Sequence, residues 1–160
     1  METVDELLFI LTLVTALGCG LIAGVFFAFS AFVMKAFARL TPTEGIGAMQ
    51  SVNVAVLNPL FLGVFVGTAV ACVLAVAASL FRWHEPGAVY LLVGGLLYLI
   101  GTFLVTMVFN VPRNEALAKV APADGERLWA NYLASWTAWN HVRTVAALAA
   151  AASFTIALCY

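Results

Sequence analysis

The sequence predicts an all-α integral membrane protein, a four-transmembrane-helix bundle. Of the 160 residues, 64% are hydrophobic and only 9% are charged, whereas a soluble domain carries about 25% charged residues. The mean hydropathy is +1.07. So few polar residues cannot cover a soluble core. A membrane β-barrel would need segments that alternate polar and apolar residues, and the sequence has none.

Four apolar segments are long enough to cross a bilayer, since a helical span needs about 20 residues. They cover approximately 7–34, 57–81, 88–111 and 136–160. Helices are expected because they satisfy their own backbone groups in lipid. Acidic residues precede the first segment where a cleaved signal peptide would carry positive charge. With no internal repeat, residues 1–160 are expected to form one membrane domain.

The loops after the first and third spans are expected to contain short helices. Thr41-Pro42-Thr43-Glu44 has the spacing of a capping box with proline at the first helical position, which predicts a helix within 41–56. Pro112 predicts that the third span ends near Asn110 or Val111. A short helix should follow in the region 112–135, where a further helix from about Glu126 runs unbroken into the fourth span.

The distribution of charge predicts the orientation. Six of the seven basic residues lie on the side of the two long loops, and only Arg82 lies on the side of the termini. An excess of Lys and Arg marks cytoplasmic loops. The long loops are therefore expected in the cytoplasm and both termini outside, as in a bacterial inner membrane. With a net charge of −1 and no basic patch, the expected partner is the lipid bilayer and not nucleic acid.

Small residues and cysteines lie on the predicted helices. Gly20-x-x-x-Gly24 and Gly63-x-x-x-Gly67-x-x-x-Ala71-x-x-x-Ala75 would let helices approach closely in lipid. Packing within one chain is favoured for these ridges, and a homo-oligomer remains open. Cys19 and Cys72 are expected at equal depth as small core residues. No C-x-x-C pair is present, so no metal site is predicted.

Uncharged polar residues gather in the cytoplasmic half of every span. Thr102, Thr106 and Asn110 form one i, i+4 stripe on the third span. Asn140-His141-Val142-Arg143 stands where the last helix enters the bilayer, where polar groups usually face the interior of a bundle. The arrangement predicts a pocket that is polar at its mouth and apolar below. Such a pocket suits a hydrophobic aromatic small molecule with polar edges.

The candidate residues lie on all four spans and on the loops that join them. They are Phe26, Ser30, Asn53, Asn58, Phe65, Thr106, Asn110, Arg113, Asn114, Trp136, Trp139, Asn140, His141 and Arg143. Several have structural alternatives: Asn58 and Asn110 as helix caps, the tryptophans as an interfacial belt, and Arg143 as a residue that reaches to lipid headgroups. For His141, flanked by Asn and Arg, the functional interpretation is favoured.

Four motifs resemble the anthrone oxygenase-like family of small four-span membrane proteins, from roughly Leu11 to Leu158. They are Phe27-Ala-Phe-Ser-Ala-Phe32, Asn53 with Asn58-Pro59-Leu-Phe61, Thr106-Met-Val-Phe-Asn-Val-Pro-Arg-Asn114 and Trp136-Thr-Ala-Trp-Asn-His-Val-Arg143. The resemblance implies a four-helix membrane bundle and conversion of a polycyclic anthrone to an anthraquinone, with O2 as co-substrate and no metal or flavin cofactor. It also implies functional positions at Trp136, Trp139, Asn140, His141 and Arg143.

The chemistry of such a reaction fits these residues. Loss of the acidic C–H of an anthrone gives a phenolate that can transfer an electron to O2. His141, if its ring faces inward, is the candidate general base, and Asn140, Arg143 and Arg113 would stabilise the anion. The alternative is a non-catalytic accessory subunit or lipophilic-ligand-binding protein that uses the same pocket. A haem or metal protein is less favoured, since only one histidine is expected to face inward, and a transporter ranks last.

Overall fold

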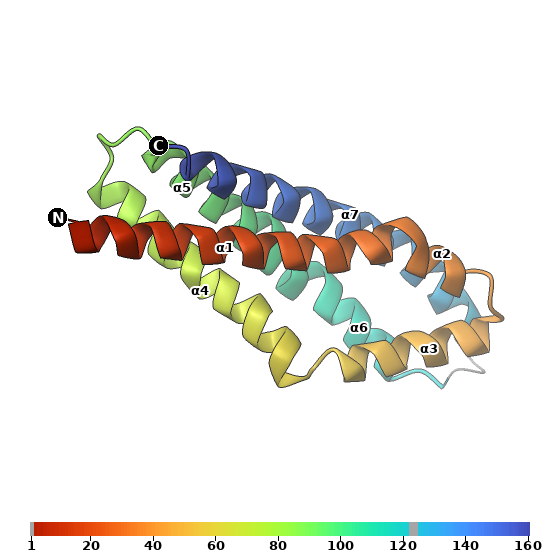
Figure 1. The fold of residues 1–160 in the computed structure, drawn as a ribbon. Helices are drawn as coiled ribbons and strands as arrows, with labels where there is room; N and C mark the ends of the chain where they lie inside the picture. The colour runs from red at the N-terminus through yellow and green to blue at the C-terminus, as the bar shows by residue number, and fades with distance from the viewer. Residues whose placement is uncertain (1, 122–124) are drawn as a thin grey trace.

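The computed structural model describes residues 2–121 and 125–160. Long helices lie lengthwise against one another, and α3 lies near the end of the bundle opposite both chain termini (Figure 1). No strand occurs within the described residues. The elements are α1 Glu2–Ala28, η1 Phe29–Val33, α2 Met34–Phe37, α3 Pro42–Ala55, α4 Pro59–Phe81, α5 Ala88–Leu96, η2 Leu97–Leu104, η3 Thr106–Asn110, α6 Val111–Ala118 and α7 Glu126–Ala157.

Three helical stretches are long and apolar enough to cross a membrane. They are Thr3–Phe37, Pro59–Phe81 and Ala88–Ala118. The 32-residue helix α7 is not among them, because Asn140, His141 and Arg143 interrupt its apolar run. The all-helical fold and the membrane-type helices are thus confirmed. The fourth span, and with it the four-span bundle, stays a prediction.

Both loops contain the expected helices. At the start of α3, the Glu44 amide donates to Thr41 Oγ1 at 3.4 Å and the Thr41 amide donates to Glu44 Oε2 at 3.1 Å, which completes the capping box. Hydrogen bonds from the Thr41 hydroxyl and amide lower the pKa of Glu44. η3 ends at Asn110, and α6 begins at Val111 with Pro112 in its first turn, so the expected short helix is present and follows without a loop. The end of the membrane span near Asn110 stays a prediction.

Three π-helical segments, η1, η2 and η3, were not expected from the sequence. Their turns are wider than those of an α-helix: the Met34 amide donates to Phe29 O and the Val111 amide donates to Thr106 O, each five residues back. The wide turn at η3 carries the chain past Pro112 without a break. π-Helical turns occur often at functional sites, and η1 and η3 contain Ser30 and Thr106 of the predicted polar constellation.

Two hydrophobic clusters fill the bundle. The first, in the membrane-type helices, surrounds Phe65, whose ring centroid lies 5.3 Å from that of Phe103 and 5.9 Å from that of Phe61. Cys19 and Cys72 are fully buried within this cluster, as expected for core residues. The second cluster, near the α3 end, joins the long loops to α7. Its buried members are Met34, Ile46, Met49, Leu117, Trp129, Tyr132 and Trp136.

The helices approach most closely at glycines other than those predicted. A Cβ on Gly95 would lie 2.5 Å from Val76 Cγ2 and 3.0 Å from Cys72 O, and one on Gly101 would lie 2.5 Å from Ala146 Cβ. By contrast, Cβ atoms on the glycines of the two predicted ridges would meet no described atom within 4 Å. The four glycines of the ridges therefore do not pack within the chain as predicted, whereas Ala75 of the second ridge is fully buried in the core. A homo-oligomer stays a prediction.

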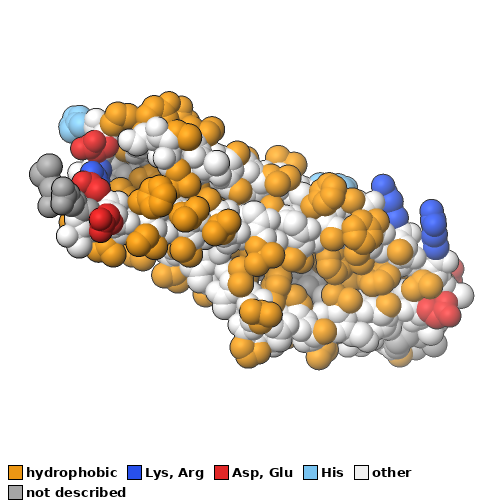
Figure 2. Space-filling model, in the orientation of Figure 1, with side chains coloured by type: hydrophobic (Ala, Val, Ile, Leu, Met, Phe, Trp, Pro, Cys, Tyr) orange, Lys and Arg blue, Asp and Glu red, His pale blue; other side chains and the backbone are white. Residues whose placement is uncertain are grey.

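The surface supports a membrane protein. Exposed hydrophobic side chains cover much of the visible face of the bundle, while charged side chains of both signs gather at its two ends (Figure 2). α1 alone exposes Leu7, Ile10, Val14, Leu17 and Leu21, each at 55% or more. Charged ends separated by an apolar belt are typical of a bundle in lipid. Which end faces the cytoplasm stays a prediction.

Gly95→Ala should destabilise the protein by about 1–3 kcal/mol, because overpacking forces neighbouring atoms to move and the carbonyl of Cys72 belongs to a rigid helix. The matched control is Gly67→Ala, for which the structure offers open space. Its effect should stay within about 1 kcal/mol, the range of helix propensity. Unfolding in mixed micelles, followed by circular dichroism, measures both. Equal effects of the two substitutions would contradict the α4–α5 contact described here.

Candidate functional site

A buried arginine lies at the centre of the polar residues. Arg143 on α7 is 4% exposed. Its Nη2 donates to Asn140 Oδ1 at 2.6 Å, and its Nη1 donates to Thr106 Oγ1 at 3.2 Å. The guanidinium carbon lies 4.1 Å from the centre of the Phe26 ring and 5.1 Å from that of Trp136. These five residues are called the arginine cluster.

No carboxylate of the described residues balances the charge of Arg143. The one ion pair among them joins Arg82 to Asp5 at the other end of the bundle. Aromatic faces attract a guanidinium through the quadrupole of the ring, so Phe26 and Trp136 offset part of its cost of burial. They do not neutralise it, and Arg143 remains a buried cation with neutral partners.

Asn140 joins α7 to α1. Its side chain is fully buried, and its Nδ2 donates to Phe26 O and to Ser30 Oγ, each at 2.7 Å. Ser30 Oγ also lies 3.1 Å from Thr144 Oγ1, within hydrogen-bonding distance. With its Nδ2 held in this way, Asn140 can point only its Oδ1 towards Arg143. Asn140 therefore fixes the direction of the guanidinium.

Asn114 on α6 orients the aromatic wall of the cluster. Its Oδ1 accepts hydrogen bonds from the Tyr132 hydroxyl at 2.8 Å and from Trp136 Nε1 at 2.9 Å. Burial raises the pKa of Tyr132, which keeps this phenol in its neutral, donating form. One acceptor thus holds the edges of two rings. Asn114 thus holds Trp136 in place against the guanidinium of Arg143 through a hydrogen bond to the indole.

Three buried polar atoms have no hydrogen-bond partner among the described residues. They are Arg143 Nε, Asn53 Nδ2 and Asn110 Oδ1. Asn110 is 1% exposed, and its Nδ2 donates to Trp136 O at 3.3 Å. An unsatisfied buried group costs about 1–3 kcal/mol, so such groups call for a bound molecule or a water. The free donor of Arg143 would suit an oxygen atom of a ligand.

His141 does not face the interior. It lies on the exposed side of α7, because adjacent residues on a helix point about 100° apart and the inward side is taken by Asn140, Arg143 and Thr144. The prediction that its imidazole faces inward is therefore wrong. His141 stands beside the cluster in sequence and outside it in space.

Two other candidates, Arg113 on α6 and Trp139 on α7, contact residues outside the arginine cluster. Trp139 is half-buried, and its ring stacks on that of Phe109 with centroids 3.6 Å apart. Arg113 donates from Nε to Ser135 Oγ at 3.0 Å and from Nη1 to Phe109 O at 2.6 Å. Trp139 thus joins α7 to η3, and Arg113 joins α6 to α7.

The candidates on α3, on α4 and at the start of α4 have different structural roles. Asn58 is exposed and caps α4, since its Oδ1 accepts from the Phe61 amide at 2.9 Å, so the structural alternative describes it. Asn53 on α3 has a buried Nδ2 without a hydrogen-bond partner among the described residues. Phe65 lies in the core, where it reaches the cluster through Phe26, with ring centroids 6.4 Å apart.

The candidate set omitted Tyr132 and Thr144, both of which are buried and take part in the network. The spacing of Trp129, Tyr132, Trp136, Asn140 and Arg143 is three, four, four and three residues. This spacing follows one face of an α-helix. A search along that face would have included Tyr132.

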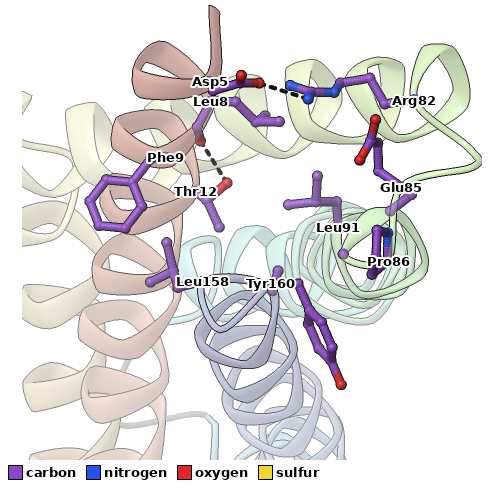
Figure 3. Close-up of a pocket in the computed structure, with 13 residues that line it drawn as sticks. Asp5, Leu8, Phe9, Thr12, Arg82, Glu85, Pro86, Leu91, Leu158 and Tyr160 are labelled. Atoms are coloured by element: carbon purple, nitrogen blue, oxygen red, sulfur yellow. Dashed lines mark hydrogen bonds and ion pairs between the residues drawn. The ribbon is translucent and has the colours of Figure 1, made fainter. Parts of the chain in front are cut away.

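The side chains of the arginine cluster pack against one another, and the open pocket at the polar rim stays a prediction. Two hollows lie at the opposite end of the bundle, and the one beside Arg82 has a volume of about 370 Å³. Figure 3 shows its walls, formed by α1, the α4–α5 turn and the end of the chain.

Asn114→Leu should destabilise the protein by about 2–4 kcal/mol, since it leaves the buried donors of Tyr132 and Trp136 without an acceptor and each such loss costs about 1–3 kcal/mol. Asn114→Asp keeps the accepting oxygen and should retain most of the stability. Thermal unfolding with tryptophan fluorescence measures both. If the two variants unfold alike, the Asn114 acceptor does not hold these rings.

Comparison with known proteins identifies the family. Searches of curated proteins and of solved structures found no significant match. The model of the family described as "Anthrone oxygenase" matches residues 59–153. This range is shorter than the resemblance expected from the motifs, and it includes Thr106, Trp136, Asn140 and Arg143. Because the match covers more than half of the 160 residues, the chain belongs to the anthrone oxygenase family.

Proposed function

We propose that this protein is a membrane oxygenase that oxidises an anthrone-like polycyclic phenolic substrate with O2, and that Arg143 binds the substrate's anion. Family membership supports the reaction class. The observation that carries the proposal is the buried guanidinium of Arg143, which has no carboxylate partner among the described residues and an Nε without a hydrogen bond. A buried charge without a counterion is strongly unfavourable, and an anionic ligand would relieve it.

The arginine cluster suits a phenolate ligand. Asn140 and Thr106 each accept one of the five guanidinium N–H groups, and the Nε–H has no partner among the described residues. A single phenolate oxygen at Nε would satisfy that donor. The rings of Phe26, Trp136 and the Phe65 cluster would contact the faces of the polycycle.

Arg143 would act by stabilising charge. The positive field lowers the pKa of the bound substrate, whose C–H proton passes to water as the phenolate forms. The anion then transfers electrons to O2. The CH2 carbon becomes a carbonyl in a four-electron oxidation, and O2 accepts the four electrons. One oxygen atom remains on the ring, and the other leaves as water with the two hydrogens.

The cluster contains no base of its own, since Asn140, Thr106 and Arg143 do not accept protons at neutral pH. His141 was the expected base. From the exposed side of α7 it cannot contact a substrate bound at Arg143, so we assign it no direct part in proton abstraction. No resident metal or flavin is invoked, and O2 is the oxidant.

Arg143→Gln should lower the rate of anthraquinone formation by about 10²–10³-fold, the typical cost of removing one group that stabilises an oxyanion. Its thermal stability should be equal or higher, because the substitution removes an uncompensated buried charge. Purified protein, an anthrone and O2 suffice, with absorbance of the quinone as the readout. Arg127→Gln, exposed on the same helix, is the matched control and should retain full activity.

In the same assay, His141→Ala tests whether His141 is the general base or has no direct part in proton abstraction. Its effect should fall far below the roughly 10²–10⁴-fold that a positioned general base contributes. A loss in that range would show that His141 is the base and would overturn our assignment. If wild-type protein binds the anthrone, seen as quenching of tryptophan fluorescence, without any acceleration over buffer, the protein is the ligand-binding alternative and not an oxygenase.

A further inference from the structure

The hollow at the terminal end of the bundle combines charges of both signs with an apolar floor. Its volume is about 370 Å³, within the range of small-molecule sites. Asp5 and Arg82 form an ion pair of 2.7 Å at its mouth, and Glu85 lies beside Arg82 (Figure 3). Leu8, Phe9, Thr12, Pro86, Gly87, Ala88, Leu91, Ala157, Leu158 and Tyr160 complete the lining.

The position of the hollow restricts its ligands. Arg82 caps the end of α4, a helix long and apolar enough to span a membrane, and Asp5 lies near the start of the first such helix. The charged mouth therefore stands at the level of the lipid headgroups, and the apolar floor faces the level of the acyl chains. A molecule that fills both parts must itself be polar at one end and apolar at the other.

We propose that this hollow binds a zwitterionic phospholipid with a primary amine, the headgroup chemistry of phosphatidylethanolamine. The phosphate would contact Arg82, the ammonium would donate hydrogen bonds to Glu85 and Asp5, and an acyl chain would lie over Leu8, Phe9 and Leu91. The site is separate from the arginine cluster and does not depend on the proposed oxygenase activity. Its occupant would fasten α1 to the turn between α4 and α5.

The two carboxylates distinguish the amine from its methylated counterpart. Hydrogen bonds between charged groups are about twice as strong as neutral ones, and a primary ammonium can donate three. The quaternary ammonium of phosphatidylcholine donates none, and proteins recognise it with cages of aromatic rings. Phe9 and Tyr160 extend in different directions in Figure 3 and form no such cage. An anionic headgroup would meet two carboxylates and one guanidinium.

Native mass spectrometry of the full chain, released from vesicles of equimolar phosphatidylethanolamine, phosphatidylcholine and phosphatidylglycerol, tests the proposal. Retention of phosphatidylethanolamine should exceed that of phosphatidylcholine by about tenfold, since a hydrogen bond to a charged group contributes about 1.5–3 kcal/mol and 1.4 kcal/mol is a factor of ten. Equal retention of the two lipids, or a preference for phosphatidylglycerol, would overturn it. This comparison uses wild-type protein and needs no variant to fold.

Two substitutions locate the lipid. Glu85→Gln should reduce the preference for phosphatidylethanolamine by about tenfold on the same arithmetic. Glu115→Gln, exposed on α6, is the matched control and should leave it unchanged. If both variants prefer phosphatidylethanolamine to the same extent, the lipid binds elsewhere and the assignment of this site is wrong. Glycerophosphoethanolamine, the headgroup without acyl chains, should not displace the lipid, and full displacement by it would show that the apolar floor contributes nothing.

Discussion

The burial of one guanidinium governs the arrangement of the arginine cluster. Arg143 has only neutral hydrogen-bond partners among the described residues, Asn140 and Thr106, and two aromatic rings pack over it. Such a charge is tolerated only where every neighbour is placed to favour it. The contacts of Asn140 with α1 and of Thr106 with Arg143 therefore connect three helical stretches through a single cation. Helix packing and charge stabilisation depend on the same side chains.

The arginine cluster also lies between two kinds of aromatic residue. On the side of the loops, Trp129, Tyr132 and Trp136 combine rings with hydrogen-bonding groups, and Asn114 anchors two of them. On the membrane side, Phe26, Phe61, Phe65 and Phe103 form an almost purely apolar cluster. A flat molecule with a polar edge finds complementary surroundings only at the boundary between the two. Arg143 lies at that boundary, which is why the proposed chemistry is assigned to it.

Sequence patterns predicted much of this architecture because they report strong local physics. Apolar length identified the membrane-type helices, and the capping box identified α3. These patterns did not determine which side of each helix faces the interior of the bundle. In the sequence, Asn140, His141 and Arg143 are equally plausible as inward-facing polar residues, yet only Asn140 and Arg143 face inward. In an apolar bilayer, a glycine that meets a neighbouring helix and one that meets lipid also look alike in sequence, so Gly67 was favoured over Gly95. The π-helical turns have no residue signature and depend on tertiary packing.

The length of α7 would place Arg143 at a defined depth in the predicted fourth span. Fourteen residues separate Arg143 from Ala157, where α7 ends, and at 1.5 Å per residue this is about 21 Å. The hydrocarbon layer of a bilayer is about 30 Å thick. With the carboxyl end of α7 at one edge of that layer, the guanidinium would lie about 9 Å inside the other. Bulk water would not hydrate a charge there, and the Asn140 and Thr106 oxygens would serve as a fixed solvation shell built into the protein.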